Sequence, residues 1–168
     1  MSATAPIVDD PERRAGDDHH ESLRLWLRML TCTLMVERTV RAKLRERFAI
    51  SLPRFDLMAQ LERSPAGLTM GELSRRLMVT GGNVTGLTRE LVEEGLVRRT
   101  VARDDRRSYS VRLTAKGKRA FDAMAVEHER WIVALMAGMP RGERARLHAL
   151  LGTLKLTLRT HDEEAGRA

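Results

Sequence analysis

Residues 69–113 read TMGELSRRLMVTGGNVTGLTRELVEEGLVRRTVARDDRRSYSVRL, and the local structures that this stretch predicts decide the fold. Its first residue, Thr69, has the side chain of a helix N-cap, and Glu72 lies three residues later, as in a capping box. Leu73 and Leu77 give the helix that follows an apolar face. The stretch therefore opens with a short amphipathic helix that starts at Thr69.

A second helix is predicted after the break at residues 80–83. Thr80 can cap a helix that runs from about Gly81 to Glu94, and Gly95 is placed to end it. The residues expected to face inward are Val84, Leu87, Leu91 and Val92. Two short helices joined by such a turn are typical of a helix-turn-helix.

Beyond Gly95 the apolar period changes to about two, which predicts short strands over residues 97–101 and 109–113. The residues between them include a charged tip at 103–107. A hairpin directly after a helix-turn-helix predicts a winged helix-turn-helix lobe within a mainly α fold. In such a lobe the second helix enters the major groove of DNA by its N-terminal part.

The start of the second helix has the slim, polar residues that a groove-reading helix needs. They are Thr80, Gly81, Gly82, Asn83, Thr85, Gly86 and Thr88. Asparagine can pair with adenine, threonine can touch a thymine methyl or a phosphate, and Arg89 is within reach of the backbone or of guanine. Glycine near the start of a helix costs stability, so the three glycines favour a DNA-reading helix over a merely capped turn.

The hairpin concentrates positive charge. Six arginines lie on it: Arg98, Arg99, Arg103, Arg106, Arg107 and Arg112. Only Asp104 and Asp105 oppose them. An exposed arginine tip can enter a narrow minor groove, and an adjacent carboxylate can hold such an arginine in register. The alternative is a solvated charged turn, but next to the glycine-rich helix we favour a wing.

The flanking segments predict long helices. Residues 21–48 carry one apolar stripe, formed by Leu23, Leu27, Leu30 and Leu34. A helix of that length spans about 40 Å, more than a small domain needs internally, so its outer part is expected to pack on a partner subunit. Thr114 begins the next helix, whose predicted face is Phe121, Met124, His128, Trp131 and Leu135. Pro140 begins the last, with a helix–helix seam of Leu147, Leu151, Leu154 and Leu158.

These elements predict one chain organisation. It consists of a flexible arm (1–20), a dimerisation helix (21–50), the winged helix-turn-helix lobe (51–113), C-terminal dimerisation helices (114–160) and a tail (161–168).

The bulk composition excludes several classes of protein. Hydrophobic residues make up 42% and the net charge is +7, which excludes a disordered chain and favours a polyanionic partner. The single cysteine, Cys32, predicts a reducing compartment, and no signal peptide or membrane span is recognised, so a cytoplasmic protein is expected. No phosphate loop, nucleophile elbow, HExxH helix or Cys/His cluster is found, so neither an enzyme nor a cofactor or metal site is expected.

The stretch from Leu68 to Gly117 resembles the MarR family of bacterial transcription regulators. The most telling parts are NVTGLTRELVEEGLV at 83–97 and DDRRSYSVRLTAKG at 104–117, which is similar to the family's Asp-Arg-Arg wing followed by Leu-Thr-x-x-Gly. The resemblance implies a homodimer that binds a pseudo-palindromic double-stranded operator, most simply as a repressor released by a small ligand. The chain departs from the family at Gly81-Gly82, where members often carry Pro or Ser, which puts the base preference in doubt.

The resemblance also implies roles for individual residues. The recognition-helix residues are Thr80, Gly81, Gly82, Asn83, Thr85 and Arg89, and the wing residues are Arg103, Asp105, Arg106 and Arg107. Within the wing, Asp105 would brace the tip, Arg107 would enter the minor groove, and Arg106 would lie near a phosphate. Thr69 is the helix cap of the lobe.

The family often binds aromatic or anionic effectors, and this chain offers candidates without a motif. They are Trp26, Arg38, Arg41, Phe55, His128 and Trp131. Arg41 could hold an anion, but an ion pair with Glu37, four residues away, is preferred. Cys32 could sense oxidants, but a buried small side chain is preferred. The alternative functions are a protein-interaction module and a non-specific architectural DNA binder.

Overall fold

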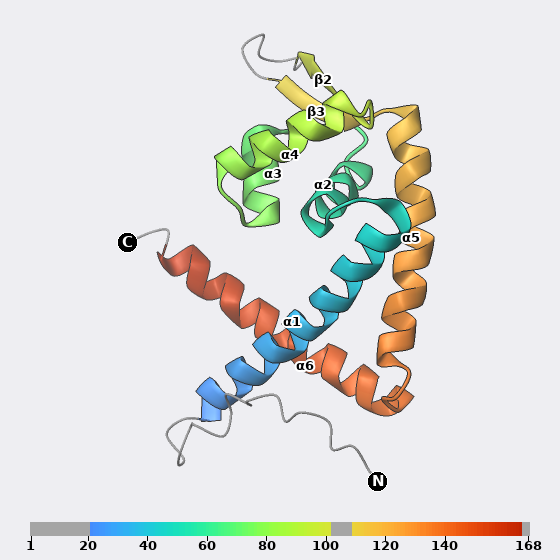
Figure 1. Ribbon diagram of the computed structural model, residues 1–168. Helices are drawn as coiled ribbons and strands as arrows, with labels where there is room; N and C mark the ends of the chain where they lie inside the picture. The colour runs from blue at the N-terminus through green and yellow to red at the C-terminus, as the bar shows by residue number, and fades with distance from the viewer. Residues whose placement is uncertain (1–20, 102–108, 166–168) are drawn as a thin grey trace. The chain divides into compact units, whose positions relative to one another are not determined.

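The computed structural model describes residues 21–101 and 109–165 (Figure 1). In these ranges the elements are α1 (Glu21–Phe48), α2 (Leu52–Glu62), β1 (Leu68–Thr69), α3 (Met70–Leu77), α4 (Gly81–Glu93), β2 (Val97–Val101), β3 (Tyr109–Leu113), α5 (Ala115–Met136) and α6 (Arg141–Ala165). The mainly α fold with a β-hairpin is confirmed. The chain divides into two compact units, Met1–His128 and Glu129–Ala168, and each is described by itself.

The long N-terminal helix is confirmed. It has no glycine or proline, and its predicted bounds, 21–48, are those of α1. Val40 and Leu44 near its C-terminal end are buried, whereas Leu23 and Leu34 in the earlier part are about half exposed. The outer part of α1 therefore presents apolar side chains that no described residue of the first unit covers.

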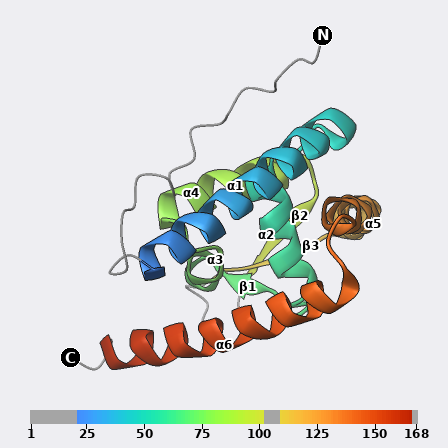
Figure 2. The same cartoon turned by 90° about the horizontal axis from the view of Figure 1, so that it is seen from below.

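α2 lies at the centre of the first unit. Figures 1 and 2 both show α3 and α4 on one side of α2 and the first part of α5 on the other. Pro53 lies in the first turn of α2, where a missing N–H costs nothing. The largest fully buried side chains come from α1, α2, α3, α4, β2 and β3 and are Leu44, Leu57, Met58, Leu61, Leu73, Val84, Thr88, Leu91, Val97 and Val111.

The sheet has one strand more than the sequence predicted. β2 and β3 form the expected antiparallel hairpin, with Val97 opposite Leu113 and Val101 opposite Tyr109. β1 pairs with the other edge of β3, so that the strand order is β1-β3-β2. A strand of two residues has no period to read, and its pairing with β3 joins segments far apart in sequence.

The second unit presents an apolar face of its own. Leu147, Leu151 and Leu158 of α6 are exposed, and so is Leu135 of α5. α6 continues to Ala165, into the segment predicted as a tail. Across the described ranges, no helix combines the length and apolar character that a membrane crossing requires.

Candidate nucleic-acid interface

The turn between α3 and α4 is built by local hydrogen bonds. The Thr69 hydroxyl accepts from the Glu72 N–H (3.2 Å), and the Glu72 carboxylate accepts from the Thr69 N–H (2.7 Å), so the predicted capping box is present. The bonds that the Thr69 N–H and the Thr69 hydroxyl (2.8 Å) donate to the Glu72 carboxylate hold the pKa of Glu72 below its usual value. At the other end, Met78 takes a left-handed conformation (φ 53°) and closes α3. The Ser74 hydroxyl donates to the Val79 carbonyl (2.5 Å), which fixes the entry to α4.

α4 presents one polar face to solvent. The side chains or backbone of the predicted recognition residues Gly81, Gly82, Asn83, Thr85 and Arg89 are all exposed, as is Thr80 before them. The opposite face is buried through Val84, Thr88 and Leu91, which recur at steps of four and three. The helix thus holds its slim N-terminal half out of the core.

No described residue requires the glycines of α4 for its packing. A Cβ added to Gly81, Gly82 or Gly86 would meet no atom within 4 Å, and none of the three has a positive φ. Each such glycine still weakens a helix by about 0.5–1 kcal/mol relative to alanine. The missing side chains are therefore explained best by something outside the chain that comes close to this backbone.

Three expectations about α4 were wrong in detail. Thr88 was grouped with the slim polar face, but it is fully buried, because its spacing from Val84 and Leu91 places it on the apolar stripe. Val92 was expected inward and is 38% exposed. Thr80 is the N-cap residue as predicted, yet its side chain makes no capping hydrogen bond.

The hairpin places arginines on both described strands. Arg98 and Arg99 on β2 are exposed, and Arg98 lies opposite Arg112 on β3. The predicted tip residues Arg103, Asp105, Arg106 and Arg107 lie outside the described residues. The strands that lead to the tip therefore carry positive charge beside the C-terminal end of α4.

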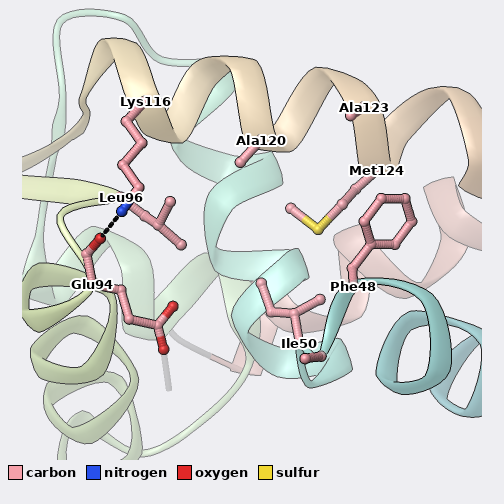
Figure 3. Close-up of a pocket in the computed structure, with 9 residues that line it drawn as sticks. Phe48, Ile50, Glu94, Leu96, Lys116, Ala120, Ala123 and Met124 are labelled. Atoms are coloured by element: carbon pink, nitrogen blue, oxygen red, sulfur yellow. Dashed lines mark hydrogen bonds between the residues drawn. The ribbon is translucent and has the colours of Figure 1, made fainter.

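The C-terminal end of α4 is tied to α5. Gly95 has a φ of +68°, and the Gly95 and Leu96 N–H groups donate back to Val92 and Leu91 carbonyls (2.9 Å each), which forms a Schellman motif. Lys116 Nζ donates to the Glu94 carbonyl (2.7 Å; Figure 3), so a cation complements the negative end of the helix dipole.

α5 begins in direct contact with this junction. The Thr114 hydroxyl donates to the Gly95 carbonyl (2.8 Å) and accepts from the Gly117 N–H (2.9 Å). A Cβ on Gly117 would lie 1.8 Å from the Leu96 carbonyl oxygen, so only glycine fits there. The Leu-Thr-x-x-Gly pattern is thus explained as a close helix–backbone contact.

Among the described residues of the first unit, two cavities lie between helices. One of about 390 Å³ lies between the end of α1, the end of α4 and α5, and is lined mainly by Phe48, Ile50, Leu96, Ala120 and Met124 (Figure 3). The other, of about 420 Å³, lies among α2, α3 and α5 and includes Phe55, Asp56, Arg63, Arg76 and His128. Only the second contains residues predicted for an effector.

The structure brings together part of the predicted effector set. The Phe55 ring lies 5.0 Å from the His128 ring and 5.5 Å from the Phe121 ring. Burial lowers the pKa of His128, and burial together with the charge of Glu37 raises the pKa of Asp56 to about 6.

The remaining effector candidates lie elsewhere. Trp26 and Arg38 on α1 are exposed, and Trp131 is buried. Arg41 makes the expected ion pair with Glu37 (3.4 Å). Cys32, expected as a buried small side chain, is exposed in the single chain.

Comparison with known proteins gives a consistent result. A family model described as MarR family matches residues 50–108. A MarR family transcriptional regulator from Silicibacter pomeroyi superposes with a TM-score of 0.74 at 32% identity, over 86% of this chain and 99% of that one. Streptococcus pneumoniae FabT, solved in complex with DNA, superposes with a TM-score of 0.69 at 25% identity, over 83% of this chain and 99% of that one.

Two curated relatives match over a shorter range. They are the transcriptional activatory protein BadR of Rhodopseudomonas palustris (29% identical over 61% of this chain) and the transcriptional repressor YetL of Bacillus subtilis (31% over 58%). The match spans 59% of the length of each relative. The solved relative from Silicibacter pomeroyi is covered almost completely, and the fold agrees with it. The chain therefore belongs to the MarR family of transcription regulators.

Proposed function

We propose that the protein is a transcription regulator that binds double-stranded DNA as a homodimer, with α4 in the major groove and the β2–β3 hairpin against the neighbouring minor groove. The observation that carries the proposal is the exposed start of α4, where three glycines leave open space around the backbone. The relative solved in complex with DNA supports DNA binding. The residues proposed to face the major groove are Thr80, Gly81, Gly82, Asn83, Thr85 and Arg89.

The first experiment uses Gly82→Ala, which separates stability from binding. Because the site is open and helical, alanine is expected to raise the free energy of unfolding by about 0.4–1 kcal/mol. If DNA lies against this backbone, the added methyl group is expected to weaken binding to the protein's own upstream DNA about fivefold or more, since overpacking costs roughly 1 kcal/mol or more. Thermal unfolding and fluorescence anisotropy measure the two effects.

Gly142→Ala is the matched control. Gly142 is also the second residue of a helix, α6, and also has open space around its Cβ position. It is expected to show the same gain in stability with unchanged DNA affinity. Equal DNA affinity for Gly82→Ala and the wild type would contradict a close contact between DNA and the start of α4.

The wing is proposed to act through Arg107, with Arg103 and Arg106 near the backbone and Asp105 bracing the tip. Arg107→Ala is expected to weaken operator binding more than tenfold, because the variant lacks both the positive charge and the side chain that fits a narrow minor groove. Sedimentation equilibrium is expected to show an unchanged dimer. Anisotropy that reports wild-type affinity for the variant would remove the wing assignment.

We assign the effector site to the cavity that contains Phe55, Asp56 and His128, which has aromatic walls and two arginines, Arg63 and Arg76. A small aromatic anion fits this lining, and benzoate is a suitable probe. Asp56, with a pKa of about 6, is ionised at neutral pH and repels an anion, but is neutral at lower pH. Benzoate is therefore expected to bind about threefold to tenfold more tightly at pH 5.5 than at pH 7.5.

Calorimetric titration of benzoate at the two pH values checks this expectation. Asp56→Asn mimics the neutral carboxyl, so it is expected to bind tightly at both. A wild-type affinity that does not change with pH would contradict the proposed placement of the anion.

In its simplest form the regulatory response is repression that a ligand relieves. Transcription measured with and without the effector gives the direction of this response.

A further inference from the structure

The start of α2 holds the C-terminal half of α4 through charge. Arg54 Nη2 donates to Glu94 Oε2, and Arg54 Nε lies 3.9 Å from Glu90 Oε2. Glu90 and Glu94 are one turn apart on α4, so they present two carboxylates to one guanidinium. These three residues form what we call the Arg54 cluster.

The exposures in the cluster are unequal. The Arg54 side chain is only 11% exposed, whereas those of Glu90 and Glu94 are about half exposed. The Arg54 Nε atom is buried and makes no hydrogen bond to any described residue. Carboxylates that remain half in water gain little net free energy from an ion pair. The cluster therefore fixes the angle of α4 more than it adds to the free energy of unfolding, because a guanidinium with fixed planar geometry engages two points along the helix.

The angle of α4 matters most at its N-terminal end, which lies far from the Arg54 cluster. Gly82 and Glu94 are separated along α4 by about 18 Å, at about 1.5 Å per residue. A rotation of about 5° at the Glu94 end therefore moves the Gly82 end by about 1.5 Å. Hydrogen bonds to base edges have a usable range of only about 0.5 Å, so such a movement is enough to lose them.

We propose that Arg54 is a positioning residue for DNA recognition, which sets the angle of α4 through Glu90 and Glu94 without touching DNA. This inference rests on the proposed function, because it needs α4 to read base pairs. It predicts a loss of sequence preference and not of general affinity for DNA. Contacts with phosphates depend on total charge and tolerate small movements, whereas base contacts do not.

The test compares Arg54→Met with Arg47→Met. Arg47 also makes an ion pair between two helices, with Glu127 (2.8 Å), and its replacement changes the net charge equally. The operator is the duplex that the wild-type protein selects from a random pool. Affinity for this duplex and for a scrambled duplex is measured by anisotropy, with unfolding followed in parallel so that only folded protein is compared.

Arg54→Met is expected to lower the ratio of operator affinity to scrambled-duplex affinity about tenfold, which is the effect of losing one base contact. Its affinity for the scrambled duplex is expected to stay within about twofold of the wild-type value. Arg47→Met is expected to keep the wild-type ratio. Glu94→Gln is expected to lower the ratio as well, and the double variant Arg54→Met/Glu94→Gln to be no worse than Arg54→Met, because the two residues act through one contact.

Three results would overturn the proposal. One is an Arg54→Met variant that keeps the wild-type preference for the operator duplex. Another is an Arg54→Met variant that loses affinity for the operator and for the scrambled duplex in equal measure. The third is an equal loss of preference in Arg47→Met. If Arg54→Met does not fold, Glu94→Gln decides by the same ratio. A folded wild-type protein that selects no duplex would instead overturn the proposed function, and this inference with it.

Discussion

Replacing Leu154 and Leu158 together with glutamate is expected to convert the proposed dimer into a monomer. Leu158 is exposed in the single chain, as are Leu147 and Leu151 on the same stripe of α6. Such a face is stable in water only when a partner covers it. Two charges placed in an apolar seam would weaken the dimer by about a thousandfold or more, because each uncompensated charge costs at least about 2 kcal/mol.

Sedimentation equilibrium measures this effect directly. The matched control is Leu156→Glu with Thr160→Glu, which adds the same charges at the same spacing on the opposite side of α6, where both residues are exposed. The control is expected to remain a dimer. A double variant at Leu154 and Leu158 that is still a dimer at micromolar concentration would rule out this seam, and loss of the dimer in both would mean that charge alone is responsible.

The second large effect is expected at the start of α5. Gly117→Ala would place a methyl group 1.8 Å from the Leu96 carbonyl oxygen, which is backbone and cannot rotate away. Either α5 shifts or the Thr114 hydrogen bonds to this junction break. Overpacking of this kind costs about 3 kcal/mol, which corresponds to a fall in melting temperature of roughly 6–12 °C.

Differential scanning calorimetry on Gly117→Ala and Gly71→Ala separates this contact from the general effect of replacing glycine. Gly71 lies in α3, with open space around its Cβ position, so its replacement is expected to leave the melting temperature unchanged or slightly higher. An unchanged melting temperature for Gly117→Ala would show that α5 does not approach Leu96 so closely. Since this junction also ends α4, the variant is further expected to bind DNA less well.

Local signals predicted most of the described fold. The Thr69–Glu72 box, the left-handed Gly95 and the run without glycine or proline over residues 21–48 each fix a boundary by short-range chemistry. The paired strands of the hairpin were also predicted from short-range signals. Their alternation is local, and the polar stretch between them limits where the turn can be.

The errors concern a side chain whose burial its polarity does not predict and a strand too short to show a period. Thr88 has a hydroxyl and was taken as a surface residue, but the apolar spacing around it decides its position, and its hydroxyl lies 3.9 Å from the Met70 sulfur. The steps of four and three that join Val84, Thr88 and Leu91 indicate burial more strongly than one hydroxyl indicates exposure. β1 has only two residues, so no local pattern announces it.

Long-range charge pairs had no sequence signal at all. Arg54 lies far along the chain from Glu94, and nothing in the pattern of α2 or α4 indicates that the two meet. The effector set shows the same limit, because the sequence names Phe55 and His128 together with Trp26 and Arg38 and does not indicate which of them lie close to one another. Which side chains share a cavity depends on helix packing, not on spacing.

The most direct test of the central claim is an anisotropy titration of the folded dimer against a labelled fragment of its own upstream DNA, at several salt concentrations and against a scrambled duplex. We predict tight binding that prefers the upstream fragment and falls steeply with salt, since each phosphate contact adds roughly 0.9 to the logarithmic slope. Salt-sensitive binding without preference would instead indicate an architectural DNA binder. No binding to either duplex by a verified folded dimer would contradict the account and point to a protein partner for the exposed face of α4.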